Sequence, residues 1–69
     1  MEMTSVTSDA VLSVGYDPAA RVLRVAFRGG GVYDYLDVDA DLFEAMLEPH
    51  PWHRVSELVK SHRFRELPS

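Results

Sequence analysis

Apolar and polar side chains alternate along most of residues 10–36. A period of two is typical of β-strands, because successive side chains point to opposite faces of a sheet. Residues 10–16 place four apolar side chains on one predicted face, namely Ala10, Leu12, Val14 and Tyr16. Residues 21–28 form the clearest strand, with Leu23, Val25 and Phe27 on one face and Val22, Arg24, Ala26 and Arg28 on the other. Residues 32–36 form a third strand, in which Tyr33 and Tyr35 share a side.

Short turns join these three predicted strands. Asp17 and Pro18 favour a turn after the first strand, because Asp suits its first position and Pro presets φ for its second. The run Gly29-Gly30-Gly31 suits a tight hairpin, since glycine reaches positive φ without steric cost. Three strands joined in this way predict an antiparallel meander, whose apolar face requires a cover.

Two amphipathic helices are predicted to provide that cover. Asp37 and Asp39 are candidate N-caps of the first helix, and Pro49 ends it. Its apolar stripe comprises Leu42, Phe43, Ala45, Met46 and Leu47. The second helix runs from Trp52 to about His62, and its apolar positions are Trp52, Val55, Leu58 and Val59. We therefore expect an α+β fold, a three-stranded antiparallel β-meander followed by one or two α-helices packed on one sheet face.

Length and composition indicate one small globular domain. The chain has 69 residues, of which 46% are hydrophobic and 26% are charged. We expect a flexible lead-in at residues 1–9 and a single domain at residues 10–67. The absence of cysteine excludes a disulfide scaffold and a thiolate zinc site. Because no signal-peptide pattern and no window of about 18 apolar residues occurs, we expect a cytoplasmic protein with no membrane partner.

Charge is distributed unevenly along the chain. Residues 1–49 carry three Arg against nine Asp and Glu, a net charge of −6 within a total of −4. Residues 50–69 carry +2, from Arg54, Lys60, Arg63 and Arg65 against Glu57 and Glu66. An anionic partner would therefore be expected to approach the C-terminal third of the chain. The closing residues 63–69 are expected to be ordered only if Phe64 and Leu67 pack into a groove.

The order of these elements resembles a known family. The succession comprises Val14-Gly15-Tyr16-Asp17, Leu23-x-Val25-x-Phe27, a glycine turn, Tyr33-x-Tyr35, Val38 and a short apolar helix. This succession, over about residues 7–47, resembles the KTSC domain, which occurs at the C-terminus of some lysyl-tRNA synthetases and as small free-standing bacterial proteins. The sequence departs from the family pattern at Glu48-Pro49-His50-Pro51-Trp52. The resemblance implies a role near RNA or the translation apparatus.

Two kinds of binding role follow from these residues. An RNA-binding role would use Tyr33 and Tyr35 as a stacking platform, joined by the C-terminal cations Arg54, Lys60, Arg63 and Arg65. Packing in the core or across strands is the favoured interpretation of the same tyrosines, because the acidic residues near them would repel phosphate. The alternative is a protein–protein interaction or homo-oligomerisation domain, in which Trp52 and Phe64 dock against another chain. The overall negative charge favours this alternative.

Catalytic and metal-binding patterns are weak. His50 and His53 lie three residues apart and His62 follows, but no His-Glu-x-x-His motif or other full ligand set accompanies them. The glycine run is followed by a predicted strand and not by the Lys-Ser/Thr and helix of a phosphate-binding loop. We therefore expect a non-catalytic module without metal or cofactor.

Overall fold

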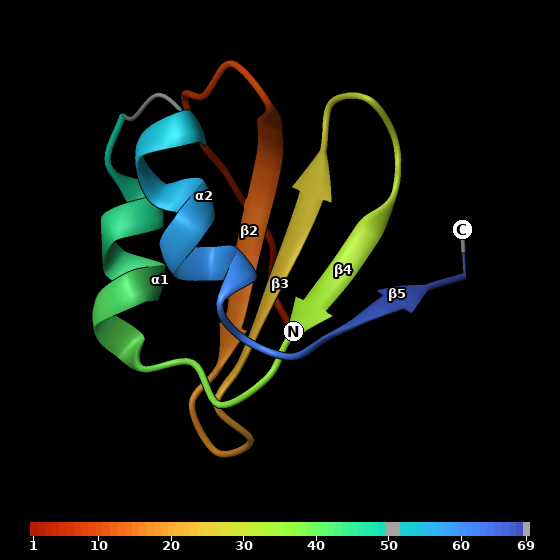
Figure 1. Ribbon diagram of the computed structural model, residues 1–69, viewed down its shortest axis with the longest axis vertical. Coiled ribbons are helices and arrows are strands. Elements are labelled where there is room, and N and C mark those ends of the chain that lie inside the picture. The colour runs from red at the N-terminus through yellow and green to blue at the C-terminus, as the bar shows by residue number, and fades with distance from the viewer. Residues whose placement is uncertain (50–51, 69) are drawn as a thin grey trace.

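The chain folds into one antiparallel sheet with two helices, seen in the computed structural model, which describes residues 1–49 and 52–68 (Figure 1). The strands are β1 (Thr4–Ser5), β2 (Val11–Asp17), β3 (Val22–Phe27), β4 (Val32–Tyr35) and β5 (Phe64–Leu67), and they lie in that order across the sheet. The helices are α1 (Ala40–Leu47) and α2 (Trp52–Lys60). The predicted α+β fold is confirmed, and the three predicted strands form the centre of a larger sheet.

The turns between the central strands have the predicted chemistry. The Asp17 carboxylate accepts hydrogen bonds from the backbone N–H groups of Ala19 and Ala20, at 3.0 and 3.2 Å, and so closes the turn into β3. In the hairpin between β3 and β4, Gly30 and Gly31 adopt φ values of 104° and 92°. These angles are accessible to glycine and strained for other residues.

The register of β2 corrects one predicted face. Val11 pairs with Phe27 and Ser13 with Ala26, so Leu12 is an extra residue in a β-bulge. The bulge reverses the alternation before Ser13, so Val11 is completely buried and Leu12 remains 46% exposed. The prediction that Leu12 shares a face with Val14 and Tyr16 is therefore wrong, because a simple period of two cannot include an inserted residue.

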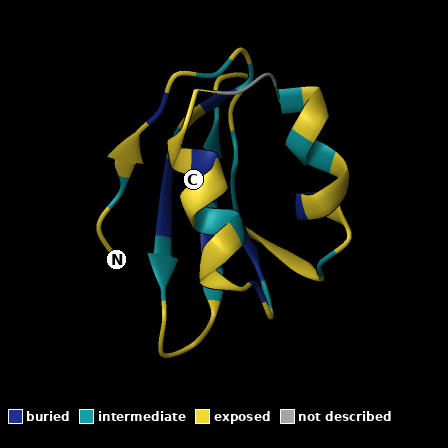
Figure 2. Ribbon diagram, turned by 90° about the vertical axis from the view of Figure 1, so that its left-hand side faces the viewer, coloured by how far each residue is buried: buried dark blue, intermediate teal, exposed yellow. Residues whose placement is uncertain are grey.

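The core lies between the helices and one face of the sheet. Its buried apolar side chains come from all parts of the chain, namely Val6, Val11, Val14, Leu23, Val25, Tyr35, Val38, Met46 and Val59. Figure 2 shows the difference between an inner and an edge strand: three of the seven residues of β2 are buried and three are half-buried, whereas both residues of β1 are exposed. Leu58 is 59% exposed, so its predicted place in the apolar stripe of α2 is wrong. Within the described part of the chain, no helix is both long and apolar enough to cross a membrane.

The two helices begin in different ways. Asp39 occupies the N-cap position of α1, but its side chain makes no capping hydrogen bond and pairs instead with Arg21. The prediction of a side-chain cap from Asp37 or Asp39 is therefore not met, because a nearby guanidinium competes for the Asp39 carboxylate. The backbone N–H of Trp52 donates to the Asp9 carboxylate at 2.8 Å, which lowers the pKa of Asp9. A residue from before the first central strand thus caps α2.

The edge strands come from the ends of the chain. Two residues of the predicted lead-in, Thr4–Ser5, pair with β2. The closing segment pairs with β4 through Phe64–Leu67, so it is ordered by strand pairing and not by a groove. The helix α1 ends at Leu47, two residues before Pro49, as predicted. The predicted break at Pro49-His50-Pro51 lies partly outside the described residues, which exclude 50 and 51.

Candidate functional site

Five aromatic side chains form a continuous group on the helix-facing side of the sheet. We call this group the aromatic surface, and it consists of Phe27, Tyr33, Tyr35, Trp52 and Phe64. The ring of Phe27 meets those of Trp52 and Tyr33 edge-on, with centroids 5.2 and 5.7 Å apart. The ring of Phe64 lies 5.8 Å from Tyr33 and 6.0 Å from Tyr35. The group therefore extends from the start of α2 to the edge strand β5.

Exposure differs sharply within the aromatic surface. Phe64 is 60% exposed, whereas Tyr35 is 4% exposed and Tyr33 and Trp52 are half-buried. Burial raises the pKa of Tyr35, because the phenolate form would lose its hydration. A buried ring offers no open face to a base, so Tyr35 belongs to the packing of the sheet. Phe64 is the member that offers most of its surface to a partner.

The third tyrosine lies elsewhere. The hydroxyl group of Tyr16 donates a hydrogen bond to the carbonyl oxygen of Val38 at 2.5 Å. Its ring stacks on Phe43 of α1 at a centroid distance of 5.3 Å. Tyr16 therefore fixes the connection between the sheet and α1, and it does not join Tyr33 and Tyr35.

The four predicted RNA-binding cations do not gather in one place. Arg54 and Lys60 lie on α2, on the helix-covered side, where the Lys60 ammonium is 6.0 Å from the centroid of the Trp52 ring. Arg65 lies on the opposite face, 3.6 Å from the Asp34 carboxylate. Arg63, which precedes β5, lies 3.6 Å from Asp37. The sheet separates the two pairs, and carboxylates neutralise part of the charge near β5.

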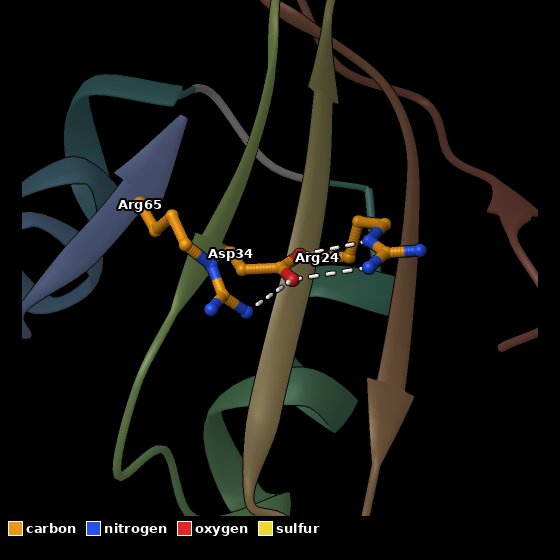
Figure 3. Close-up of polar contacts among 3 residues, drawn as sticks. All are labelled: Arg24, Asp34 and Arg65. Carbon is orange, nitrogen blue, oxygen red and sulfur yellow. Dashed lines mark hydrogen bonds and ion pairs between the residues drawn. The ribbon is translucent and has the colours of Figure 1, made fainter. Parts of the chain in front are cut away.

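A charged cluster occupies the helix-free face of the sheet, as Figure 3 shows. The guanidinium of Arg24 donates two hydrogen bonds to the Asp34 carboxylate, at 2.7 and 3.0 Å, and Arg65 approaches from the other side. The Asp34 carboxylate is almost completely buried, yet the bonds from Arg24 lower its pKa below the ordinary value. A planar guanidinium that meets a carboxylate in this way is held firmly. Two guanidinium groups thus share one carboxylate, so the three side chains together carry a net charge of +1.

The origin of this cluster explains why sequence reasoning missed it. In the sequence, Arg24 and Arg28 share one predicted strand face, and Asp34 stands between Tyr33 and Tyr35. The strand register pairs Arg24 with Asp34 and Asp34 with Arg65, a pairing that alternation along one strand does not indicate. Arg28 instead donates from Nε to the carbonyl oxygen of Ser8 at 3.0 Å. The sequence did contain one indication of this pairing: Asp34 lies between two aromatic residues of a predicted strand, a position where a charged side chain favours an opposite charge on the neighbouring strand.

A cleft of about 330 Å³ lies between α1 and α2. Its lining residues are Asp39, Asp41, Leu42, Ala45, Leu58, Ser61 and His62. The Nδ1 atom of His62 donates to the carbonyl oxygen of Leu58 at 3.0 Å, so this nitrogen bonds to the backbone of α2. Asp39 is paired with Arg21. Two of the three titratable side chains in the cleft are thus engaged within the fold.

The described residues contain no group of three or more His, Cys, Asp and Glu side chains that could hold a metal ion. His53 and His62 lie at opposite ends of α2 and its following turn. The third histidine of the sequence-based metal hypothesis, His50, lies outside the described residues.

Comparisons with known proteins agree with this architecture. Residues 7–50 match the model of the KTSC domain. An uncharacterised protein from Stutzerimonas stutzeri is 35% identical over 66 residues, covering 94% of this chain and 93% of its own length. A protein from Tsukamurella paurometabola is 35% identical over 65 residues, covering 94% and 97%. The crystal structure of a KTSC domain protein from Yersinia pestis superimposes with a TM-score of 0.86 at 29% identity, covering 97% of both chains.

Proposed function

The chain belongs to the KTSC domain family, and from this premise we propose that it is a small, non-catalytic binding module that recognises a protein partner. The partner contacts the exposed end of the aromatic surface, at Phe64. One observation carries the proposal: Phe64 is 60% exposed although it touches Tyr33 and Tyr35, which pack into the sheet. Aromatic residues, Phe among them, are enriched in protein interfaces relative to the rest of the protein surface.

Charge supports a protein partner over a nucleic acid. The chain has a net charge of −4, and the cations near Phe64 each have a carboxylate within 3.6 Å. Nucleic-acid affinity depends on cations that are free to replace counterions along the phosphate backbone. Burial of an aromatic ring against another protein has no such requirement.

Peptide selection tests this proposal. A library of random peptides displayed on phage is panned against the wild-type chain, and Phe64→Ala serves as the counter-selection. We expect clones that bind the wild-type chain and lose at least about tenfold in affinity with Phe64→Ala, since truncation of a residue at the centre of binding typically costs about 2 kcal/mol or more. Leu58→Ala is the matched control, because Leu58 is equally exposed but lines the cleft between the helices. If no clone distinguishes Phe64→Ala from wild type, the proposal is wrong.

RNA binding is a second candidate, because the exposed Phe64 stands between Arg63 and Arg65 along the chain. Stacking beside cations is a common feature of single-strand recognition. Titration with a mixed tRNA pool at low and moderate salt separates the two functions. An RNA-binding module would lose affinity as salt rises and again with Arg63→Glu, whereas a protein-binding module shows no binding even at low salt.

Self-association is the other form of a protein-binding role. Sedimentation over a range of concentrations detects it directly. A dimer that Phe64→Ala disrupts and Leu58→Ala preserves would identify the partner as a second copy of this chain. A monomer at high concentration indicates that the partner is a different protein.

A further inference from the structure

Among the residues that the structure describes, no strand pairs with the outer side of the edge strand β5. In an antiparallel ladder, residues alternate between those that bond to the neighbouring strand and those that point away from it. The backbone N–H of Leu36 donates to the carbonyl oxygen of Arg63 at 2.7 Å, which fixes the phase of this alternation. Arg63, Arg65 and Leu67 therefore face β4. The N–H and C=O groups of Phe64 and Glu66 point away from the sheet, and Figure 1 shows β5 alone at that edge.

The charges on the helix-free face form a row that ends at this edge. The register aligns Gly15, Arg24, Asp34 and Arg65 across four strands. Positive and negative charges alternate from β3 to β5, as Figure 3 shows for its three charged members. The last member, Arg65, keeps 67% of its side chain exposed. Because opposite charges stabilise directly facing positions, an acidic side chain on a further strand would complement this row.

On the helix-covered face, β5 presents an apolar and an acidic side chain to a neighbouring strand. Phe64 and Glu66 point to the helix-covered side, where they face Tyr35 and Tyr33 of β4. An apolar side chain on a further strand would cover the exposed ring of Phe64. A cation would pair with the carboxylate of Glu66. The first three positions of β5 would therefore be complemented by three different side chains on a neighbouring strand.

We infer that β5 binds an extended segment of the protein partner, which adds to the sheet as a sixth, antiparallel strand with a cation, an acid and an apolar residue at consecutive positions. The order follows from the antiparallel direction: the cation faces Glu66, the acid faces Arg65 and the apolar residue faces Phe64. All four pairings in the sheet are antiparallel. This inference rests on the proposed function and specifies the partner that the exposed Phe64 receives.

A second copy of the chain does not fit this edge. Two β5 strands related by a two-fold axis would place equivalent faces side by side. Centring the axis on Arg65 sets Arg65 against Arg65, and centring it on Glu66 sets Glu66 against Glu66. Centring it on Phe64 sets Arg63 of each copy against Arg65 of the other. Each of these three registers opposes like charges, which discourages self-pairing in them and favours a different chain as the partner of this edge.

Synthetic peptides test the predicted order. The probe is a fluorescein-labelled peptide with the sequence Thr-Val-Lys-Glu-Val-Thr, and the control has the two charges exchanged, Thr-Val-Glu-Lys-Val-Thr. By fluorescence polarisation we expect the probe to bind at least about tenfold more tightly than the control, since two facing ion pairs are exchanged for two like-charge pairs. The double variant with Arg65→Glu and Glu66→Arg should reverse this preference.

A backbone variant tests the strand pairing itself. Glu66→Pro removes an N–H group that points away from β4, so it deletes a bond to the peptide without deleting one inside the sheet. Glu66→Ala is the matched control, because it removes the same carboxylate and keeps the N–H. We expect Glu66→Pro to abolish binding of the probe and Glu66→Ala to weaken it only severalfold. Thermal unfolding of each variant establishes that it is folded.

The outcomes separate this inference from the function on which it rests. If the selected peptides depend on Phe64 but bind Glu66→Pro as well as Glu66→Ala, the protein-binding role stands and the added strand is wrong. If no peptide depends on Phe64, the protein-binding role itself fails. Equal affinity of the probe and its charge-exchanged control also overturns the inference.

Discussion

Strands β3 and β5 belong to the same sheet but bury very different shares of their side chains. Leu23 and Val25 of β3 are completely inaccessible to solvent, whereas Phe64, Arg65 and Glu66 of β5 are all exposed. The helices pack against the central strands, and the edge strand has a neighbour on one side only. The comparison indicates that the centre of the sheet supplies most of the stability, while β5 contributes little stability and is the surface that we propose to bind a partner.

The largest expected effect lies in the centre. Leu23→Ala removes a fully buried side chain between the sheet and the helices, and we expect it to lower the free energy of unfolding by about 2–5 kcal/mol. Urea unfolding followed by circular dichroism measures this loss. Leu58→Ala is the control, because Leu58 is 59% exposed, and it should change stability by less than about 0.5 kcal/mol. Similar losses from both variants would contradict the comparison.

The next effect concerns Asp34, which links the centre to the edge through Arg24 and Arg65. Asp34→Asn keeps the shape of the side chain and removes its charge. We expect a loss of about 1–3 kcal/mol at neutral pH, because the partly buried guanidinium of Arg24 loses a charged acceptor.

This loss should depend on pH. The pKa of Asp34 is lowered in the folded chain from its ordinary value of 3.8, so its stabilising effect is fully present above about pH 4. It disappears as the pH falls through the lowered pKa and the carboxylate takes up a proton. Thermal unfolding of wild type and Asp34→Asn between pH 7 and pH 2 measures the difference. A difference that stays constant over this range would exclude the ion pair as its cause.

A smaller effect is expected where the other edge meets the centre. A Cβ atom at Gly15 would lie 2.8 Å from both the carbonyl oxygen of Glu2 and the sulfur of Met3, so Gly15→Ala must displace the segment that leads into β1. Because a terminal segment can move aside, we expect a cost of about 1 kcal/mol or less.

Hydrogen exchange measures this displacement directly, as faster exchange at Thr4–Ser5 and unchanged exchange in β5. Gly29→Ala is the control, since a Cβ atom there would meet nothing within 4 Å. Equal exchange at β1 in the two variants would show that the close approach at Gly15 does not hold the N-terminal segment in place.

The smallest effect on stability is expected at the exposed ring of β5. Phe64→Ala loses ring contacts with Tyr33 and Tyr35 but little buried area, so we expect a loss of about 0.5 kcal/mol. Chemical unfolding measures it beside Leu12→Ala, a comparably exposed apolar residue in the bulge of β2. A loss as large as that of Leu23→Ala would mean that β5 is part of the core and not a surface available to a partner.

The sequence predicted the central elements because each carries its own signal. Alternation located β2, β3 and β4, the glycine run located their hairpin, and Pro49 marked the end of α1. The order of these signals was also enough to indicate the family. Such features depend on residues close together along the chain, so local conformational preference determines them.

The sequence did not show the edges, the bulge or the charged cluster. The strand β1 has only two residues, too few to show an alternating pattern. The four residues of β5 are ordered by pairing with β4, from which two helices separate them along the sequence. The cap of α2 by Asp9 joins residues that are 43 positions apart. The sequence identified Arg65 and Phe64 as candidate binding residues from their residue types. It did not show that their side chains lie on opposite faces of the sheet.

Sequence alone thus determined which central segments are strands and helices, and which residue types are suited to contact a partner. The tertiary structure decided which of those residues share a face, because facing positions are set by strand register. Register depends on the pairing of distant segments, where a single inserted residue such as Leu12 reverses every face before it. For that reason the open edge at β5, with its row of alternating charge, became visible only in the folded chain.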